Sequence, residues 1–218
     1  MISNPPKLTR AEFVKKFVDV SLQQQVYNAA RKGRAEELAE LLHLYPAINV
    51  NQHMEGNGGR TALQAAAANG HDSVVALLLA HPDIDVNLHT DGKNSPLHWA
   101  CYYGETATAR LLLGDARVFV NQRERDGHSP LFWAAFTGRT DIIKWWISLG
   151  REIDLGQPGN QTTDVLGVAI REAQVETTFL LERYKSDPEQ TRSQVRAELA
   201  SDSRGNPFPT ICTVPFIF

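Results

Sequence analysis

The central part of the sequence repeats with a period of 34 residues. Three six-residue blocks, each beginning with a hydroxyl residue and ending in alanine, start at positions 61, 95 and 129. A glycine lies four residues after the last alanine of each block, and an apolar pair begins twelve residues after the same alanine. The glycines are Gly70, Gly104 and Gly138, and the pairs are Leu78-Leu79, Leu112-Leu113 and Trp146-Ile147. Internal repetition at this period indicates a solenoid of stacked units.

Each unit predicts two helices. The hydroxyl residue caps the first helix, and a proline in its first turn loses nothing by lacking an N–H. Glycine then ends this helix in a left-handed conformation. The second helix has apolar residues at i, i+1, i+4 and i+5, starting at Val74, which form one face of a 3.6-residue period. Neither helix buries its face alone, so we expect neighbouring pairs to stack and Leu78, Leu112 and Trp146 to be buried.

The unit resembles the ankyrin repeat. The resemblance rests on Ser95-Pro96-Leu97-His98-Trp99-Ala100, on Gly104, on the leucine pair and on the closing Val86-Asn87 and Val120-Asn121. It implies an all-α fold, an ankyrin-repeat solenoid of stacked helix-turn-helix units with β-hairpin-like turns between repeats. The family period is about 33 residues, and the extra residue lies in the loop 81–87, where insertion costs little.

Five repeats are expected, of which three match well. They cover approximately 21–56, 57–90, 91–125, 126–158 and 159–185 within an array at 21–185. A capping box at Thr9–Glu12 predicts an N-terminal capping helix within 1–20, and Ser21 with Gln24 predicts the start of the next helix. In the last repeat Ala173 stands where the others have glycine.

The C-terminal part predicts a helix at 186–200, followed by a Pro/Ser linker and apolar tail at 201–218. The last nine residues, Thr210–Phe218, are strongly apolar and uncharged. Three interpretations stay open for them: packing onto the last repeats, a short ligand for another protein, or a tail without fixed structure.

Composition excludes several classes of protein. The net charge is −3, which argues against a polycation that coats nucleic acid. The longest apolar run, 74–80, is too short to cross a bilayer, and the first residues lack a secretory signal. With Cys101 and Cys212 expected as free thiols, we predict a monomeric intracellular protein of the cytoplasm or nucleus.

No pattern predicts catalysis. The seven histidines form no metal-binding pair, neither cysteine belongs to a C-x-x-C motif, and no nucleophile elbow occurs. The glycine-rich stretch 55–60 lacks the Lys-Ser/Thr of a phosphate loop. The resemblance implies that His98 hydrogen-bonds between neighbouring repeats. We therefore expect no enzyme, no cofactor and no metal.

The resemblance places partner binding on the concave face, at the residues before each glycine. Tyr102, Tyr103 and Phe136 occupy these positions and are expected at the centre of an aromatic patch. The opposing interpretation is that the rings only stack on one another along the array. Trp99 and Trp133 are expected to be packing residues, and Trp145 to lie at the edge of the second-helix face while Trp146 enters the core.

A predicted hairpin tip carries Arg123, Arg125 and His128, which are expected to form the rim of this patch and to steer an acidic partner. The preferred function is a non-enzymatic scaffold or adaptor that binds another protein on the concave face. The alternative is a module that binds an acidic ligand or nucleic-acid backbone through a basic fourth repeat, because residues 110–151 hold seven basic and four acidic side chains.

Overall fold

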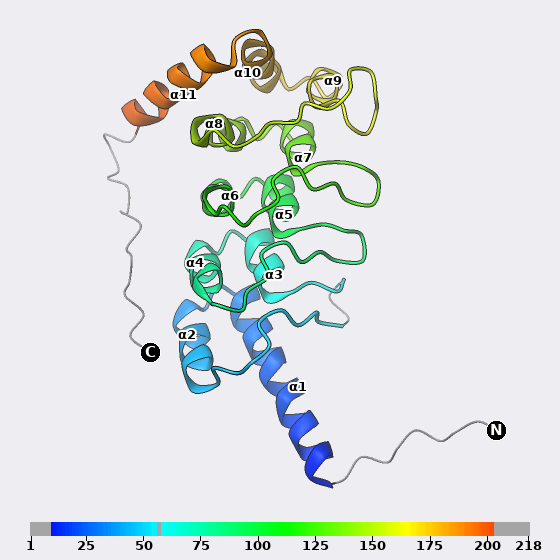
Figure 1. The fold of residues 1–218 in the computed structure, drawn as a ribbon, viewed down its shortest axis with the longest axis vertical. Coiled ribbons are helices and arrows are strands. Elements are labelled where there is room, and N and C mark those ends of the chain that lie inside the picture. Colours follow the sequence, from blue (N-terminus) through cyan, green and yellow to red (C-terminus); the bar gives the residue numbers. More distant parts are fainter. Residues whose placement is uncertain (1–9, 56–57, 203–218) are drawn as a thin grey trace, which may run out of the picture.

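The computed structural model describes residues 10–55 and 58–202, with side chains from residue 21 onward. Paired helices stack into a solenoid, with the first helix of each pair in one column and the second in another (Figure 1). The first helices are α1 (Arg10–Arg31), α3 (Ala62–Ala68), α5 (Pro96–Tyr103), α7 (Pro130–Phe136) and α9 (Val165–Arg171). The second helices are α2 (Ala35–Leu44), α4 (Asp72–Ala80), α6 (Thr106–Gly114), α8 (Thr140–Leu149) and α10 (Val175–Ser186), and α11 (Pro188–Asp202) follows.

The predicted caps begin the first helices. Thr61 accepts a hydrogen bond from the Gln64 main-chain N–H at 3.3 Å, and the Gln64 side chain accepts one from the Thr61 N–H at 2.8 Å. Ser95 caps α5 in the same way, with His98 in the place of glutamine. Pro96 then occupies the first turn, where its missing N–H removes no helical bond. The helical repeat predicted from the sequence is therefore confirmed.

The two helices predicted on either side of residue 20 are one helix. α1 runs without a break from Arg10 to Arg31, so the predicted start at Ser21 is wrong. No glycine or proline lies within this segment, and each residue added to an existing helix gains a hydrogen bond. Of the predicted N-terminal cap, Thr9 lies outside the described residues.

The second helices supply the core, and the predicted core residues are confirmed. Leu78, Leu112 and Trp146 are fully buried. The Trp146 indole N–H also donates to the Glu152 carbonyl at 3.1 Å. Trp145 is half-buried at the edge of α8, with the Arg110 guanidinium 5.0 Å from its ring centroid. The helical faces were thus assigned correctly.

Loops between repeats form hairpin-like turns closed by main-chain hydrogen bonds. In the turn before α7, the Glu124 N–H donates to the His128 carbonyl at 3.0 Å. Asparagine side chains join neighbouring loops: Asn87 donates to the Arg117 carbonyl and accepts from the Phe119 N–H, both at 2.8 Å. Across residues 10–55 and 58–202 no strand forms, apart from an isolated antiparallel bridge between Met54 and Arg60.

The glycine after each first helix has a conformational reason, and the last repeat lacks this glycine. Gly104 has φ 82° and Gly138 has φ 68°, in the left-handed region. Ala173, at the same position in the last repeat, has φ 55°. A side chain in this conformation costs roughly 1–2 kcal/mol. Ala173 therefore carries backbone strain.

We expect Ala173→Gly to raise the free energy of unfolding by about 0.5–1 kcal/mol, because relief of strain exceeds the extra entropy of an unfolded glycine. Urea titration measures the change. The control is Ala197→Gly, at an exposed position inside α11, which should lower stability by about 0.5–1 kcal/mol. Equal losses for the two variants would contradict the assignment of strain to Ala173.

None of the described helices combines the length and apolar character needed to cross a membrane.

Candidate partner-binding face

The predicted aromatic residues lie on two adjacent first helices. Tyr102 and Tyr103 are in the last turn of α5, directly before Gly104, and Phe136 is the last residue of α7. The 34-residue step places these positions side by side in the column of first helices (Figure 1). Because the caps fix where α5 and α7 begin, they also fix the side from which these rings project.

The rings form one continuous row, which we call the aromatic strip: Trp99, Tyr102, Tyr103, Trp133 and Phe136. Within α5, Trp99 stacks on Tyr103 with centroids 6.0 Å apart, and Tyr103 meets Tyr102 edge to face at 5.1 Å. Tyr102 crosses to α7 and meets Trp133 edge to face at 5.2 Å. Trp133 meets Phe136 at 5.6 Å. Trp133 thus connects Phe136 to the tyrosines.

The rings pack on one another and still face solvent. Edge-to-face pairs of this kind contribute roughly 0.5–1.5 kcal/mol each, so the strip is held in place before any partner arrives. Tyr102 and Tyr103 nevertheless stay 41% and 43% exposed. Trp99, Trp133 and Phe136 are half-buried. Stacking along the array and an accessible surface are therefore compatible, although the sequence posed them as alternatives.

Two parts of this face were not foreseen. Trp99 and Trp133, expected only as packing residues, are members of the strip. The Arg60 guanidinium lies over the Trp99 ring, 3.7 Å from its centroid, and extends the strip towards the second repeat. The tryptophan before the core alanine in two successive repeats, at positions 99 and 133, is the sequence signal that could have revealed the strip. Arg60 has no such signal, because it comes from an inter-repeat turn.

The three rim residues are on the turn before α7, but they do not present three unpaired cations. Arg123 forms an ion pair with Asp154 at 2.6 Å and donates to the Gly127 carbonyl at 2.9 Å. Arg125 is exposed, and its guanidinium donates to the Asp91 carbonyl at 2.8 Å. Of the two arginines, Arg125 has no carboxylate partner among the described side chains, so it keeps the charge that could steer a partner.

His128 lies between this turn and the aromatic strip. Its ring is 5.1 Å from Trp133, centroid to centroid, and its Nδ1 is 2.6 Å from a Glu124 carboxylate oxygen. Burial alone would raise the pKa of Glu124, but hydrogen bonds from the Asp126 and His128 N–H groups and the His128 ring lower it. Glu124 therefore stays ionised and holds the turn together.

Glu124, Asp126 and His128 place potential ligand atoms within 4.8 Å of one another. Both Glu124 oxygens already accept hydrogen bonds within the turn. The geometry is explained by these bonds, and it needs no ion to hold it.

His98 bonds between repeats, as the resemblance implied. Its Nδ1 accepts from the Ser95 N–H at 3.1 Å, which leaves the proton on Nε2, and Nε2 donates to the His128 carbonyl at 3.3 Å. Burial lowers the pKa of His98 to about 4, partly offset by the bond to His128. Cys101 is fully buried, and burial raises the pKa of its thiol. A neutral, bonded imidazole and a protonated thiol give no nucleophile–base pair at this place.

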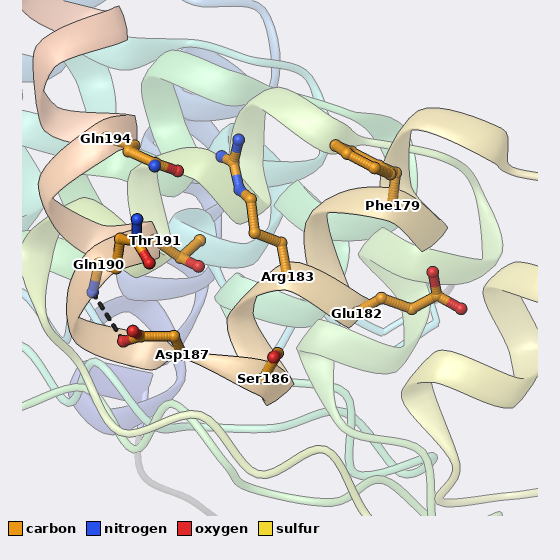
Figure 2. A pocket seen from close by; sticks show the side chains of 8 residues that line it. All are labelled: Phe179, Glu182, Arg183, Ser186, Asp187, Gln190, Thr191 and Gln194. Carbon is orange, nitrogen blue, oxygen red and sulfur yellow. Dashed lines mark hydrogen bonds between the residues drawn. The ribbon is translucent and has the colours of Figure 1, made fainter.

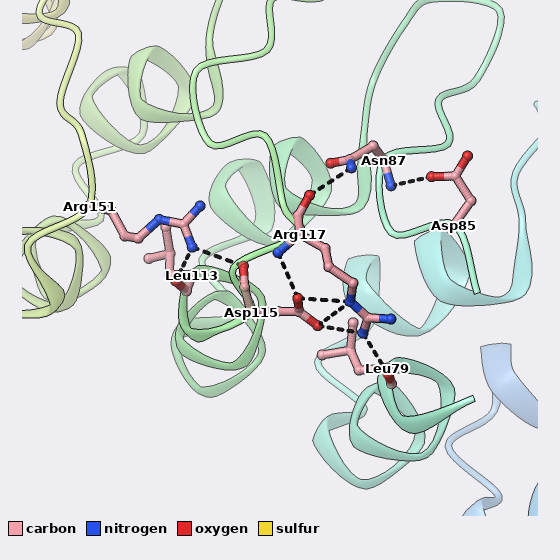
Figure 3. Close-up of polar contacts among 7 residues, drawn as sticks. All are labelled: Leu79, Asp85, Asn87, Leu113, Asp115, Arg117 and Arg151. Carbon is pink, nitrogen blue, oxygen red and sulfur yellow. Dashed lines mark hydrogen bonds and ion pairs between the residues drawn. The ribbon is translucent and has the colours of Figure 1, made fainter. Parts of the chain in front are cut away.

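The basic residues of the stretch 110–151 are largely engaged in holding the solenoid together. Arg117 pairs with the Asp115 carboxylate at 2.6 Å and donates to the Leu79 carbonyl, near the end of α4, at 2.7 Å (Figure 3). Arg151 donates to the Leu113 carbonyl, near the end of α6, at 3.0 Å (Figure 3). Cations at helix C-termini interact favourably with the helix dipole. Arg117 and Arg151 are 34 residues apart, a spacing from which this role could have been predicted.

Comparisons with known proteins place these repeats in a family. A stretch of 73 residues, 34% of this chain, is 33% identical to a probable serine/threonine-protein kinase of Dictyostelium discoideum, of which it covers 9%. The SMC5-SMC6 complex localization factor protein 1 is 29% identical in Homo sapiens over 110 residues, 49% of this chain and 10% of that protein. The same factor of Bos taurus is 40% identical over 57 residues, 26% of this chain and 5% of that protein.

The chain thus spans a tenth or less of the length of these relatives. A family model described as ankyrin repeats, in three copies, matches residues 26–123. Such repeats generally mediate contacts between proteins. The match, the helical solenoid and the caps of its first helices together show that residues 26–123 consist of ankyrin repeats.

Proposed function

We propose that this protein is a non-enzymatic scaffold or adaptor, which binds a partner protein on the face formed by its first helices. The aromatic strip is the centre of the contact. The observation that carries the proposal is that five aromatic rings touch in one row across α5 and α7 while Tyr102 and Tyr103 stay exposed. Aromatic residues held rigidly at a surface lose little entropy on binding and are common hot spots.

The hydroxyl groups support this role. No hydrogen bond within the described residues engages the hydroxyl of Tyr102 or Tyr103, so each is available to a partner. The apolar ring bodies supply buried area, and the hydroxyls supply direction. This combination fits a protein surface better than it fits a small polar metabolite.

The alternative, an acidic ligand or nucleic-acid backbone on a basic fourth repeat, has less support. Arg117 and Arg123 are paired with carboxylates, and Lys144 lies 3.0 Å from Glu176. Arg151 is committed to main-chain carbonyls. A cation that is already neutralised releases few counterions when a polyanion binds.

The relatives add a context for this proposal. They are named as a kinase and as a localization factor of a complex, and they share stretches of 73 and 110 residues with this chain, about two to three repeats. A module that occurs beside different functions fits a binding role, and we carry no kinase activity over to this chain.

The test is binding of a partner recovered by pull-down from the native lysate. We expect Tyr103→Ala and Phe136→Ala to weaken binding by at least about 1–2 kcal/mol, roughly 5–30-fold, because each removes buried contact area. Tyr45→Ala is the control, since Tyr45 is 46% exposed, close to the 43% of Tyr103, but lies directly after α2. It should change affinity less than about twofold.

Association kinetics separate the rim from the strip. Arg125→Ala should slow association and reduce its dependence on salt, with little effect on dissociation. Circular dichroism checks that each variant is folded. If folded Tyr103→Ala and Phe136→Ala both bind like the parent, the strip is not the contact. A loss confined to Arg125→Ala and removed by salt would favour the acidic ligand instead.

A further inference from the structure

The last repeat leaves one side of its first helix uncovered. α3, α5 and α7 each pack between two neighbouring first helices, whereas α9 packs against α7 and α10. α11 packs on α8 and α10, so it covers the column of second helices and not that of first helices (Figure 1). The end of an array needs a cap, because the next repeat would otherwise bury this surface.

Comparison of equivalent positions shows how much apolar surface is open. Ala67, Cys101 and Ala135 follow the core alanine of their first helices, and all three are fully buried. Ile170 holds the same position in α9 and is 56% exposed. Large exposed apolar side chains at a position that is otherwise buried mark an interface.

The open surface continues onto α10. Val175, the first residue of α10, is 79% exposed, whereas Thr140 at the start of α8 is 8% exposed. Phe179, four residues after Val175 and on the same helical side, is 65% exposed. We call Ile170, Val175 and Phe179 the open end.

A pocket between α10 and α11 adjoins the open end, with Phe179 at one side (Figure 2). Two polar atoms in its lining, Arg183 Nε and Thr191 Oγ1, are buried without a hydrogen-bond partner. Unpaired buried polar atoms are costly. Both atoms are closed off from solvent, so an occupant of this region would contact the exposed parts of the lining, such as Phe179, and not these two atoms.

We propose that the apolar segment of residues 210–218 of the same chain covers the open end. The segment contains Ile211, Val214, Phe216, Ile217 and Phe218 and no charged residue. It matches the open end in chemistry, and the described fold offers it this exposed apolar surface close to the helix that precedes it. The proposal concerns the last repeat and is independent of binding at the aromatic strip.

The lengths of the elements allow this contact. α11 has 15 residues and α10 has 12, which at 1.5 Å per residue are about 22 Å and 18 Å long. Val175 therefore lies at most roughly 45 Å from Asp202, even if the two helices were laid end to end. The separation is shorter than this bound, because α10 and α11 pack against one another. When extended, the chain after Asp202 reaches about 35 Å at Cys212, ten residues on, and about 55 Å at Phe218. A tethered segment also has a high effective concentration at the open end, which favours it over a second copy.

Cys212 in this segment allows a direct test in the chain of 218 residues. Ile170→Cys, Val175→Cys and Phe179→Cys each put one exposed thiol on the open end, and Phe119→Cys is the control because Phe119 is 65% exposed in the loop after α6. Cys101 is buried and does not compete. With oxidised glutathione at low protein concentration, we expect at least one open-end variant to form the intramolecular disulfide with Cys212 at least about tenfold faster than Phe119→Cys.

Amide hydrogen exchange tests the same contact whatever its register. In the parent chain, replacement of both Phe216 and Ile217 by serine should speed exchange in α9 and at the start of α10, and leave α3 unchanged. The proposal is overturned if all four cysteine variants react with Cys212 equally fast. It is also overturned if the open-end variants form only disulfide-linked dimers, at a rate that rises with concentration, since a second copy would then cover the open end. Unchanged exchange in α9 would overturn it as well.

Discussion

Replacing Leu112 by alanine is expected to lower the free energy of unfolding by about 2–5 kcal/mol. Leu112 is fully buried in α6, where it belongs to the continuous core between stacked repeats. Its truncation removes apolar contacts and leaves a cavity that the helices of the two neighbouring repeats can fill only in part. Because each repeat is stabilised by its neighbours, the loss should lower the stability of the array and not only that of one helix.

Leu44→Ala is the matched control for this change. Leu44 ends α2 and is 66% exposed, so the same substitution should cost less than about 0.5 kcal/mol. Urea titration at neutral pH measures both variants. A loss below about 1 kcal/mol for Leu112→Ala would show that this face of α6 is not the one that holds the repeats together.

Features set by local chemistry were predictable from the sequence. The caps at Thr61, Ser95 and Ser129 recur with the period, and each satisfies N–H groups that every helix start leaves unpaired. The burial of Leu112 was predictable as well, because its distance in sequence from Ser95, which caps the first helix of its repeat, puts it on the inner face of the second helix. Repetition strengthens such signals, since one correct assignment applies to every unit.

Features set by contacts between distant residues were not predictable in the same way. α1 continues through Ser21 because nothing in the sequence ends the helix, although the local capping pattern was present. The charges of Arg117 and Arg123 looked like a basic surface, yet partners far along the chain or in adjacent loops engage them. Charge counts cannot show which cations are paired.

The candidate site shows both cases. Tyr102, Tyr103 and Phe136 could be predicted from their place before each glycine. Their connection through Trp133 could not, because it depends on the rotamer of a ring on a neighbouring helix. Residues at the same repeat position come close in space, but only the packing decides whether they touch.

A fall in pH from 7 to 4 is expected to destabilise the protein through His98 by roughly 3 kcal/mol. His98 is neutral in the fold with a pKa of about 4, against an ordinary value of 6.5. Between these values the unfolded chain binds a proton that the folded chain does not. His98 therefore does not lower the free energy of unfolding above pH 6.5, and it lowers this free energy progressively as the pH falls towards 4.

Gln64 supplies the matched variant for this prediction. It occupies the position of His98 one repeat earlier, and its side chain accepts from the Thr61 N–H at 2.8 Å and donates to the Leu88 carbonyl at 2.7 Å. His98→Gln should therefore keep the cap and the bond between repeats, with a cost at neutral pH of about 1 kcal/mol or less.

Carboxylates near His98, including Glu124, also respond to pH, so the informative quantity is the difference in stability between parent and variant. Urea titrations of both proteins from pH 7 to pH 4 give this difference. We expect the parent to lose roughly 2–3 kcal/mol more than His98→Gln over this range, since glutamine binds no proton. If the two stability curves run parallel, His98 is not held neutral in the fold, and the acid sensitivity belongs to the surrounding carboxylates, which lose their native bonds on protonation.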